Sequence, residues 1–155
     1  MMNLFEFQTK SVCICVMSTV MIFGTFDILH HGHLHLFQQV RKYGDRVITI
    51  VARDTTVEKI KGHAAFHNEK ERKAFLDHID LIDKAILGDR RDVYKVIQTV
   101  KPDVICLGYD QETFVDALEE KIKEFDLQTK IIRLKPYKHE RYKTSKVKKY
   151  LDTII

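Results

Sequence analysis

Short runs of apolar residues recur along the chain, and stretches with helical spacing separate them. The runs do not alternate with polar positions, and Val47–Val51 is the clearest example. A strand without such alternation has both faces buried, which is typical of a parallel sheet covered by helices on each side. The apolar runs predict five strands, at Val20–Phe23, Val47–Ala52, Ala85–Leu87, Val104–Leu107 and Ile131–Leu134.

Between these runs, apolar residues recur at the spacing of one helix face. The stripes are Leu36, Val40 and Tyr43; Val93, Val96, Ile97 and Val100; Phe114, Leu118, Ile122 and Phe125; and Val147, Tyr150, Leu151 and Ile154. Asn68 with Glu71 three residues later predicts a capping box for a helix over Glu69–Ile79. The alternation of strands and helices predicts one α/β domain with a doubly wound, five-stranded parallel sheet.

The composition indicates a single globular domain that handles anionic small molecules. Apolar residues make up 45% of the 155-residue chain and charged residues 31%, and the net charge of +4 is mild. A nucleic-acid-binding face is usually more densely basic. The basic residues that crowd the C-terminal end are interpreted either as a solvated helix face or as phosphate ligands: Lys135, Lys138, Arg141, Lys143, Lys146, Lys148 and Lys149.

The three cysteines have no metal-binding spacing. Cys13, Cys15 and Cys106 leave one thiol unpaired, which fits a reducing cytoplasm, and Cys106 lies in an apolar run as a small buried hydrophobe. We therefore expect a cytoplasmic protein.

A glycine- and histidine-rich segment follows the first predicted strand and leads into a helix. It reads Gly24-Thr25-Phe26-Asp27-Ile28-Leu29-His30-His31-Gly32-His33. Ligands of a parallel sheet bind beyond the carboxyl ends of its strands, and a helix N-terminus attracts anions. We expect Gly24 to let the backbone approach a phosphate and Gly32 to free space at the start of the helix.

His30 and His33 flank this helix start and can donate hydrogen bonds to phosphate oxygens. The alternatives are that the two histidines bind zinc or that His30 caps the helix; no cysteine or further histidine at ligand spacing supports zinc. His31 and His35 lie on other faces and are interpreted as surface or packing residues.

The order and spacing of Gly24-Thr25-Phe26-Asp27 and His30-x-Gly32-His33 resemble the signature of the HxGH nucleotidyltransferase superfamily, whose fold is Rossmann-like and cytidylyltransferase-like. Over residues 18–152 the chain resembles archaeal-type FAD synthases (FMN adenylyltransferases) and, next, glycerol-3-phosphate cytidylyltransferases. The resemblance implies in-line attack by a substrate phosphate on the α-phosphorus of a nucleoside triphosphate. It also implies catalysis by His30 and His33, and a Mg²⁺ ion held mainly by the nucleotide and water rather than by protein ligands.

The resemblance also assigns residues before the middle of the chain. Thr25 and Phe26, like Gly24 and Gly32, would bind the nucleotide, and Asp27 would bind the second substrate. Lys61 would be catalytic, and Lys59 and Arg72 would hold substrate phosphate. The alternatives are that the two lysines are solvated in a loop and that Arg72 forms a surface ion pair. Phe26 and Tyr109 are candidates for stacking on a flavin ring, with a place in the core as the alternative.

Two later segments match as well. Thr144 and Ser145 lie in a phosphate-binding motif of the superfamily, although Lys143 stands where the family usually has serine; by default such hydroxyls are helix N-caps. Asp110 in Gly108-Tyr109-Asp110-Gln111 falls near the base and ribose, or caps a helix beginning near Glu112.

Three local features favour ATP and FMN as substrates. Ala52-Arg53-Asp54 and Gly108-x-Asp110-Gln111 resemble the FAD synthases, and the cytidylyltransferase motif Arg-Thr-x-Gly-Ile-Ser-Thr is absent from the sequence. The alternatives are CTP-dependent transfer to glycerol 3-phosphate or a similar phosphomonoester, and a non-catalytic module that binds nucleotide or RNA. The small families resembled are commonly homodimers, so a homodimer is expected, with no membrane or nucleic-acid partner.

The first sixteen residues are predicted to be an extension outside the domain formed by residues 17–155. The run from Val12 to Phe23 is interrupted by Ser18 and Thr19 and is too short to span a bilayer. It also lacks the basic start and cleavage site of a secretory signal.

One hypothesis is that the native protein starts at Met17, just before the first predicted strand. Mass spectrometry of the native protein should then find no residue before Met17. An intact Met1 or Met2 terminus would contradict this choice of start codon.

Overall fold

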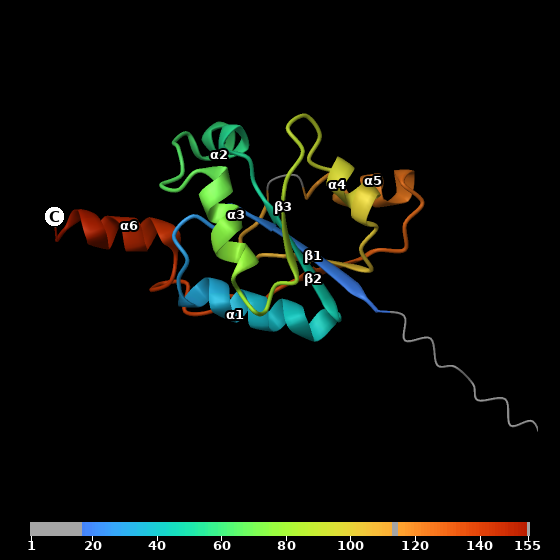
Figure 1. Ribbon diagram of the computed structural model, residues 1–155, viewed down its shortest axis with the longest axis horizontal. Helices are drawn as coiled ribbons and strands as arrows, with labels where there is room; N and C mark the ends of the chain where they lie inside the picture. Colours follow the sequence, from blue (N-terminus) through green and yellow to red (C-terminus); the bar gives the residue numbers. More distant parts are fainter. Residues whose placement is uncertain (1–16, 113–114, 155) are drawn as a thin grey trace, which may run out of the picture.

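The five predicted strands form one parallel sheet. The computed structural model describes residues 17–112 and 115–154, and its sheet has the order β3-β2-β1-β4-β5 (Figure 1). All four neighbouring pairs are parallel. The strands are β1 (Thr19–Gly24), β2 (Arg46–Val51), β3 (Lys84–Leu87), β4 (Val104–Leu107) and β5 (Lys130–Arg133).

Helices cover both faces of this sheet, as the unbroken apolar strands predict. The helices are α1 (His31–Val40), a 3-10 turn η1 (Arg41–Tyr43), α2 (Asp54–Lys61), α3 (Glu69–Asp77), α4 (Lys95–Val100), α5 (Leu118–Glu124) and α6 (Thr144–Asp152). Phe37 of α1 and Leu76 of α3 pack against one face of the sheet. Ile97 of α4 and Leu118 of α5 pack against the other.

The capping prediction for α3 is confirmed. The Asn68 side chain accepts hydrogen bonds from the amides of Lys70 and Glu71, and the Glu71 carboxylate accepts one from the Asn68 amide. Three donors at the start of the helix are thereby satisfied.

Two predictions about helices were wrong. The segment with Lys59 and Lys61 was interpreted as a loop but forms α2, in which Val57 is the only buried residue. One buried residue gives almost no periodic signal, and the better sign was Gly62, which ends α2 with a φ of 73°. Asp110 does not cap a helix, because α5 begins only at Leu118. Phe114 of the predicted stripe lies outside the described residues.

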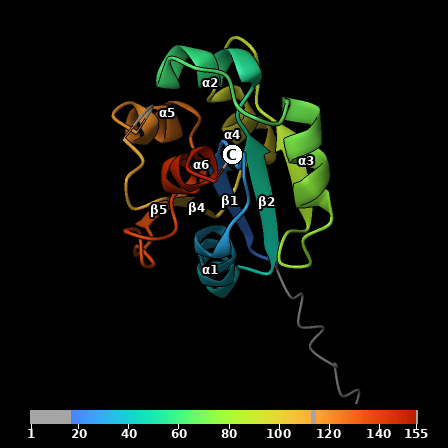
Figure 2. The same cartoon turned by 90° about the vertical axis from the view of Figure 1, so that its left-hand side faces the viewer.

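Helix α6 projects from one end of the domain (Figure 1). Viewed from that end it lies in front of the sheet, with α1 and α2 on opposite sides of it (Figure 2). Its predicted apolar stripe is largely uncovered, since Tyr150 is 66% and Ile154 62% exposed. In this structure the stripe therefore does not pack against the core.

Two further expectations concern the rest of the chain. The predicted extension, residues 1–16, lies outside the described residues, and so do Cys13 and Cys15. Cys106 is buried as predicted, and burial raises the pKa of its thiol to about 12, so it is not ionised at neutral pH. Among the described residues, no helix has the length and apolar character needed to cross a membrane.

Candidate active site

A cavity of about 370 Å³ opens at the carboxyl ends of the strands. The sheet order places β2 on one side of β1 and β4 on the other, so the cavity lies at the switch point. The wall that we call the β2 side consists of Val57, Lys61, His63 and Ala65, from α2 and the loop after it. The β4–β5 side consists of Gly108, Tyr109, Asp110, Leu134, Lys135 and Tyr137. Between the two sides lie residues at the starts of α1 and α6, among them His30, His33, Thr144 and Ser145.

His30 and His33 cap the start of α1 and one another. The Gly32 amide donates to His30 Nδ1 at 3.1 Å, and the His30 amide donates to His33 Nδ1 at 3.3 Å. The two rings stack with centroids 4.0 Å apart. Both histidines line the cavity, and the alternative that His30 caps the helix is confirmed, while hydrogen bonding to phosphate stays a prediction.

These contacts fix the tautomers of both rings. A backbone amide can only donate, so each Nδ1 must be an unprotonated acceptor. A neutral imidazole with a bare Nδ1 carries its proton on Nε2. Because Nδ1 of each ring accepts from a backbone amide, Nε2–H of the same ring remains available as a hydrogen-bond donor.

Both imidazoles are held in the neutral form. Burial, with smaller contributions from the neighbouring His30 and Lys61, lowers the pKa of His33 to about 3. Burial also lowers the pKa of His30. Two rings this close cannot both become imidazolium ions without strong repulsion between their charges. At neutral pH the site thus offers hydrogen-bond donors without imidazolium charge.

The start of α6 faces the start of α1. Thr144 Oγ1 lies 3.5 Å from His30 Nε2, and Thr144 and Ser145 line the cavity. Lys143 is the N-cap residue of α6, and its side chain makes no capping hydrogen bond. Thr144 and Ser145 are therefore first-turn residues rather than N-caps, with their hydroxyls beside the histidine pair.

Asp27 anchors the cavity wall. Its carboxylate is 4% exposed and accepts hydrogen bonds from the amides of Phe66 and His67, each at 2.9 Å. It also pairs with Lys148 of α6 at 2.8 Å. Although burial opposes ionisation, these donors lower the pKa of Asp27 to about 2. Asp27 lines the cavity, but both of its carboxylate oxygens already accept hydrogen bonds from the protein. This arrangement differs from the predicted contact with substrate.

Gly24 and Gly32 make room for different neighbouring groups. At Gly32 an added Cβ would lie 3.0 Å from the His30 ring and 3.1 Å from the Tyr142 carbonyl oxygen, so the predicted need for space there is confirmed. At Gly24 a Cβ would lie 2.6 Å from the Phe26 ring. Gly24 is not among the residues that line the cavity, and its lack of a side chain makes room for Phe26, so the approach of a phosphate to its backbone stays a prediction.

Phe26 supports the site from within the core. It is 5% exposed, is absent from the cavity wall, and packs edge-on against His33 with ring centroids 5.7 Å apart. Its φ of 51° is rare for a residue with a side chain and indicates a locally strained turn. The alternative of a place in the core is therefore confirmed for Phe26, and nucleotide contact by this residue stays a prediction; its neighbour Thr25 does line the cavity.

Arg72 is a second correction. Its side chain is fully buried and donates to the carbonyl oxygens of Thr25 and Ala52 at 2.6 and 2.8 Å. It also donates to the His67 carbonyl and pairs with Asp54 at 2.6 Å. With every nitrogen of its guanidinium engaged, Arg72 has none left for phosphate and instead joins three loops around the cavity.

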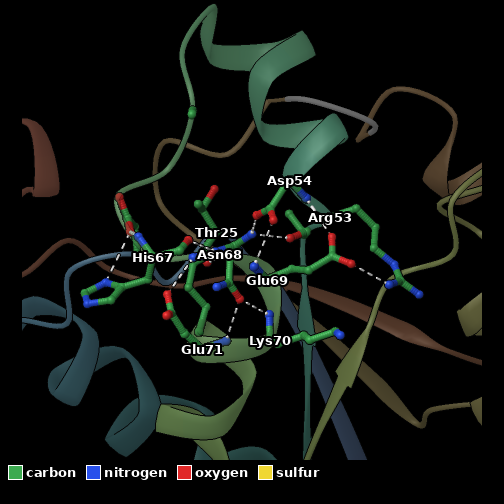
Figure 3. A network of polar contacts seen from close by, with 12 residues as sticks. Thr25, Arg53, Asp54, His67, Asn68, Glu69, Lys70 and Glu71 are labelled. Carbon is green, nitrogen blue, oxygen red and sulfur yellow. Dashed lines mark hydrogen bonds and ion pairs between the residues drawn. The ribbon is translucent and has the colours of Figure 1, made fainter.

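A polar network joins the residues at the starts of α2 and α3 (Figure 3). Glu69 accepts from Arg53 and from the Asp54 amide, and Asp54 in turn accepts from the Glu69 amide. The start of α2 is thereby fixed to the start of α3.

The two predicted lysines separate in the structure. Lys61 lines the cavity, whereas Lys59 does not. Desolvation by the cavity wall lowers the pKa of Lys61; Asp27 opposes this effect, and Lys148 adds to it. Asp110 also lines the cavity and pairs with Lys143 at 2.9 Å.

Some cavity residues were not predicted. Lys148, predicted only as one of seven basic residues near the C-terminal end, lines the cavity. His35, Tyr137 and Tyr142 also line it, and together with His31, which is outside the cavity wall, they form an aromatic cluster. The closest rings are His35 and Tyr137, with centroids 4.3 Å apart. Gln39 adds two hydrogen bonds to the Lys135 backbone. This cluster holds the segment before α6 against α1, and the spacing of His31 and His35 by one helical turn was its only sequence signal.

Comparison with known proteins gives consistent results. Residues 21–150 match the family described as cytidylyltransferase-like. An FAD synthase of Aciduliprofundum boonei is 41% identical over 78% of this chain and 80% of its own. An FAD synthase of Thermoplasma volcanium is 37% identical over 90% of this chain and 97% of its own.

A solved structure agrees with the fold. The lipopolysaccharide core biosynthesis protein of Thermoplasma volcanium superposes with a TM-score of 0.73 at 40% identity. The match covers 78% of this chain and 98% of that one.

Stability should depend on pH through His33. Its pKa is about 3 in the folded protein and 6.5 for an unperturbed histidine, so between these values the unfolded chain binds more protons. The free energy of unfolding should then rise with pH between about 4.5 and 6.5, a window above the pKa of most carboxylates. Urea unfolding of wild type and His33→Gln should show a flatter slope in the variant; equal slopes would contradict the assignment.

Loss of Arg72 should destabilise the fold. Arg72→Ala leaves three carbonyl oxygens without this donor and the Asp54 carboxylate without its cationic partner, and we expect a loss of about 3 kcal/mol in the free energy of unfolding. The control is Arg41→Ala, which breaks a partly exposed pair with Asp83 and should cost at most about 1 kcal/mol. Equal losses in urea denaturation would refute the structural role of Arg72.

Proposed function

The chain belongs to the cytidylyltransferase-like family, and from this membership we propose that it is a nucleotidyltransferase that makes FAD and pyrophosphate from ATP and FMN. The choice of ATP and FMN is supported by relatives named FAD synthases, which match most of the chain at 37 to 41% identity. The observation that carries the reaction type is the histidine pair, whose tautomers place two Nε2–H donors at a cavity.

Such a pair suits phosphoryl chemistry. An FMN phosphate oxygen attacks the α-phosphorus of ATP, the bond between the α-phosphorus and the β-bridging oxygen breaks, and pyrophosphate leaves. A phosphate monoester is already a nucleophile at neutral pH, so the site needs no general base. Catalysis then depends on positioning and on stabilising the charge that develops around the α-phosphate.

The cavity residues divide this work between them. Neutral His30 and His33 donate hydrogen bonds to the oxygens of the α-phosphate. The first turn of α6, with Thr144 and Ser145, binds the departing pyrophosphate, which the positive end of the helix dipole also stabilises. Lys61 holds the FMN phosphate on the opposite wall.

We also propose that Mg²⁺ enters with the nucleotide, held by phosphate oxygens and water. Bound there, it would neutralise charge on the triphosphate. The described residues contain no group of three or more potential ligands among His, Cys, Asp and Glu. Asp27 is occupied by its own donors and Asp110 is paired with Lys143, so the donor set suits a metal carried by the nucleotide better than a fixed protein site.

The expected homodimer stays a prediction. The exposed apolar stripe of α6 is a surface that a second copy would be able to cover. Sedimentation equilibrium would test the oligomeric state.

The proposed reaction can be tested directly. Purified protein with Mg²⁺ should convert ATP and FMN to FAD and release one pyrophosphate per FAD, followed by chromatography and a coupled pyrophosphate assay. CTP and glycerol 3-phosphate serve as competing substrates. Turnover with CTP alone would refute the adenylyltransferase, and binding without turnover would refute the enzyme.

The histidines should control the rate. His30→Ala and His33→Ala each remove an Nε2–H donor and should lower kcat on the order of 10²-fold with the fold retained. The control is His78→Ala, because His78 is an exposed histidine at the end of α3, outside the cavity wall. Wild-type turnover in both active-site variants would contradict the mechanism.

A further inference from the structure

An exposed aromatic side chain stands next to the β2 side of the cavity. Phe66 is 74% exposed, the highest value among the large apolar side chains in the part of the chain that the structure describes. It lies in the loop between α2 and α3, and its chain neighbours His63 and Ala65 line the cavity. Phe66 itself is not part of the cavity wall, so its exposed ring lies outside that wall and one residue from Ala65.

The backbone under this ring is fixed to the active site. The Phe66 amide donates to Asp27 at 2.9 Å, as does the next amide, that of His67. The His67 carbonyl accepts from buried Arg72 at 3.0 Å. Three hydrogen bonds to buried charged side chains thus hold the loop, although the side chain that it presents is almost uncovered.

The ring is also supported from one direction. Phe66 and His67 make an edge-to-face contact with centroids 4.8 Å apart, and His67 makes a second one with Phe75 at 5.2 Å. Exposing an aromatic ring costs free energy that a buried position would avoid. A firmly anchored and exposed ring beside a cavity is what a flat ligand needs as a stacking surface.

The size of the cavity requires such a surface. A volume of about 370 Å³ is near the lower end of the range for a site that holds one small-molecule ligand. Two nucleotide-sized substrates cannot both be enclosed, so at least one ring system must extend beyond the rim.

In-line geometry selects which substrate extends there. The attacking and leaving oxygens lie on opposite sides of the reacting phosphorus. Thr144 and Ser145, between the two sides, receive the pyrophosphate. Lys143, which precedes them, pairs with Asp110 of the β4–β5 side, and the Asp110 carboxylate suits ribose hydroxyls. The β2 side has a single cavity-lining ammonium from α2, that of Lys61, which suits one terminal phosphate. The attacking phosphate, and the ring that it carries, therefore belong on the β2 side.

We propose that Phe66 is the stacking surface for the isoalloxazine ring of the acceptor and a determinant of its selection. This inference rests on the proposed function, which supplies the flavin. With its phosphate at Lys61, the acceptor crosses the cavity mouth past His63 and Ala65 and places its ring on Phe66. Acceptors without a flat ring, such as glycerol 3-phosphate, gain nothing from this contact.

The test is a comparison of Michaelis constants. Phe66→Ala should raise the KM for FMN about tenfold, the size expected for loss of one aromatic stack, with kcat and the KM for ATP changed less than twofold. Phe66→Trp should restore the wild-type KM for FMN. A stacked Trp quenches flavin fluorescence by electron transfer and a Phe does not, so binding of FMN with a non-hydrolysable ATP analogue should quench flavin fluorescence more strongly in Phe66→Trp than in wild type or Phe66→Ala.

Tyr150→Ala is the matched control, since Tyr150 is an aromatic residue of similar exposure on α6, outside the main cavity wall. It should leave every constant unchanged. An unchanged KM for FMN in Phe66→Ala overturns the inference. If the KM for FMN rises in Tyr137→Ala and not in Phe66→Ala, the flavin lies on the aromatic cluster, and the inference is overturned as well. Wild-type protein that forms no FAD overturns the proposed function and this inference together, whereas FAD formation with a silent Phe66 overturns only the inference.

Discussion

The geometry of the active site depends on two hydrogen bonds at the start of α1. The Gly32 amide donates to His30 Nδ1, and the His30 amide donates to His33 Nδ1. The first-turn amides of a helix are usually the groups that meet an anion. Here the Gly32 amide donates to His30 Nδ1, so the donor that the site offers an anion is the Nε2–H of the imidazole. The same contacts select the tautomer, and burial keeps both rings neutral. The same hydrogen bonds therefore cap the helix and fix the tautomers of the histidines at the proposed phosphate site.

The surroundings of the pair hold this geometry by a few buried charges. Phe26 packs against His33 from the core, and Gly24 makes room for its ring. Asp27 joins the loop before α1, the loop after α2 and Lys148 of α6, while Arg72 joins Thr25, Ala52 and His67. Charged groups removed from water must be fully paired, so each of them specifies one arrangement of the loops. The cavity thus has rigid walls although it is made mostly of loop and helix ends.

Much of this was predictable from the sequence, and the limits have physical causes. Five strands and the capping box at Asn68 follow from local patterns, and the spacing of His30 and His33 indicated a candidate phosphate site, whose two histidines line the cavity. Arg72 and Gly24 were assigned to ligands because a sequence does not show whether a charge or a gap faces a cavity or the core. Helix α2 has too few buried residues for a periodic signal. The aromatic cluster of Tyr137 and Tyr142 with α1 is long-range and has no local pattern.

The tautomeric state of the two histidines is the most direct measure of this account. Long-range ¹H–¹⁵N correlation NMR of the imidazole nitrogens at pH 7 distinguishes a protonated Nδ1, a protonated Nε2 and the imidazolium ion. Our account predicts neutral rings protonated at Nε2 for both His30 and His33, with the Nε2 signals shifting when a non-hydrolysable ATP analogue binds. A proton on Nδ1 of either ring, or a charged imidazolium at that pH, would contradict it.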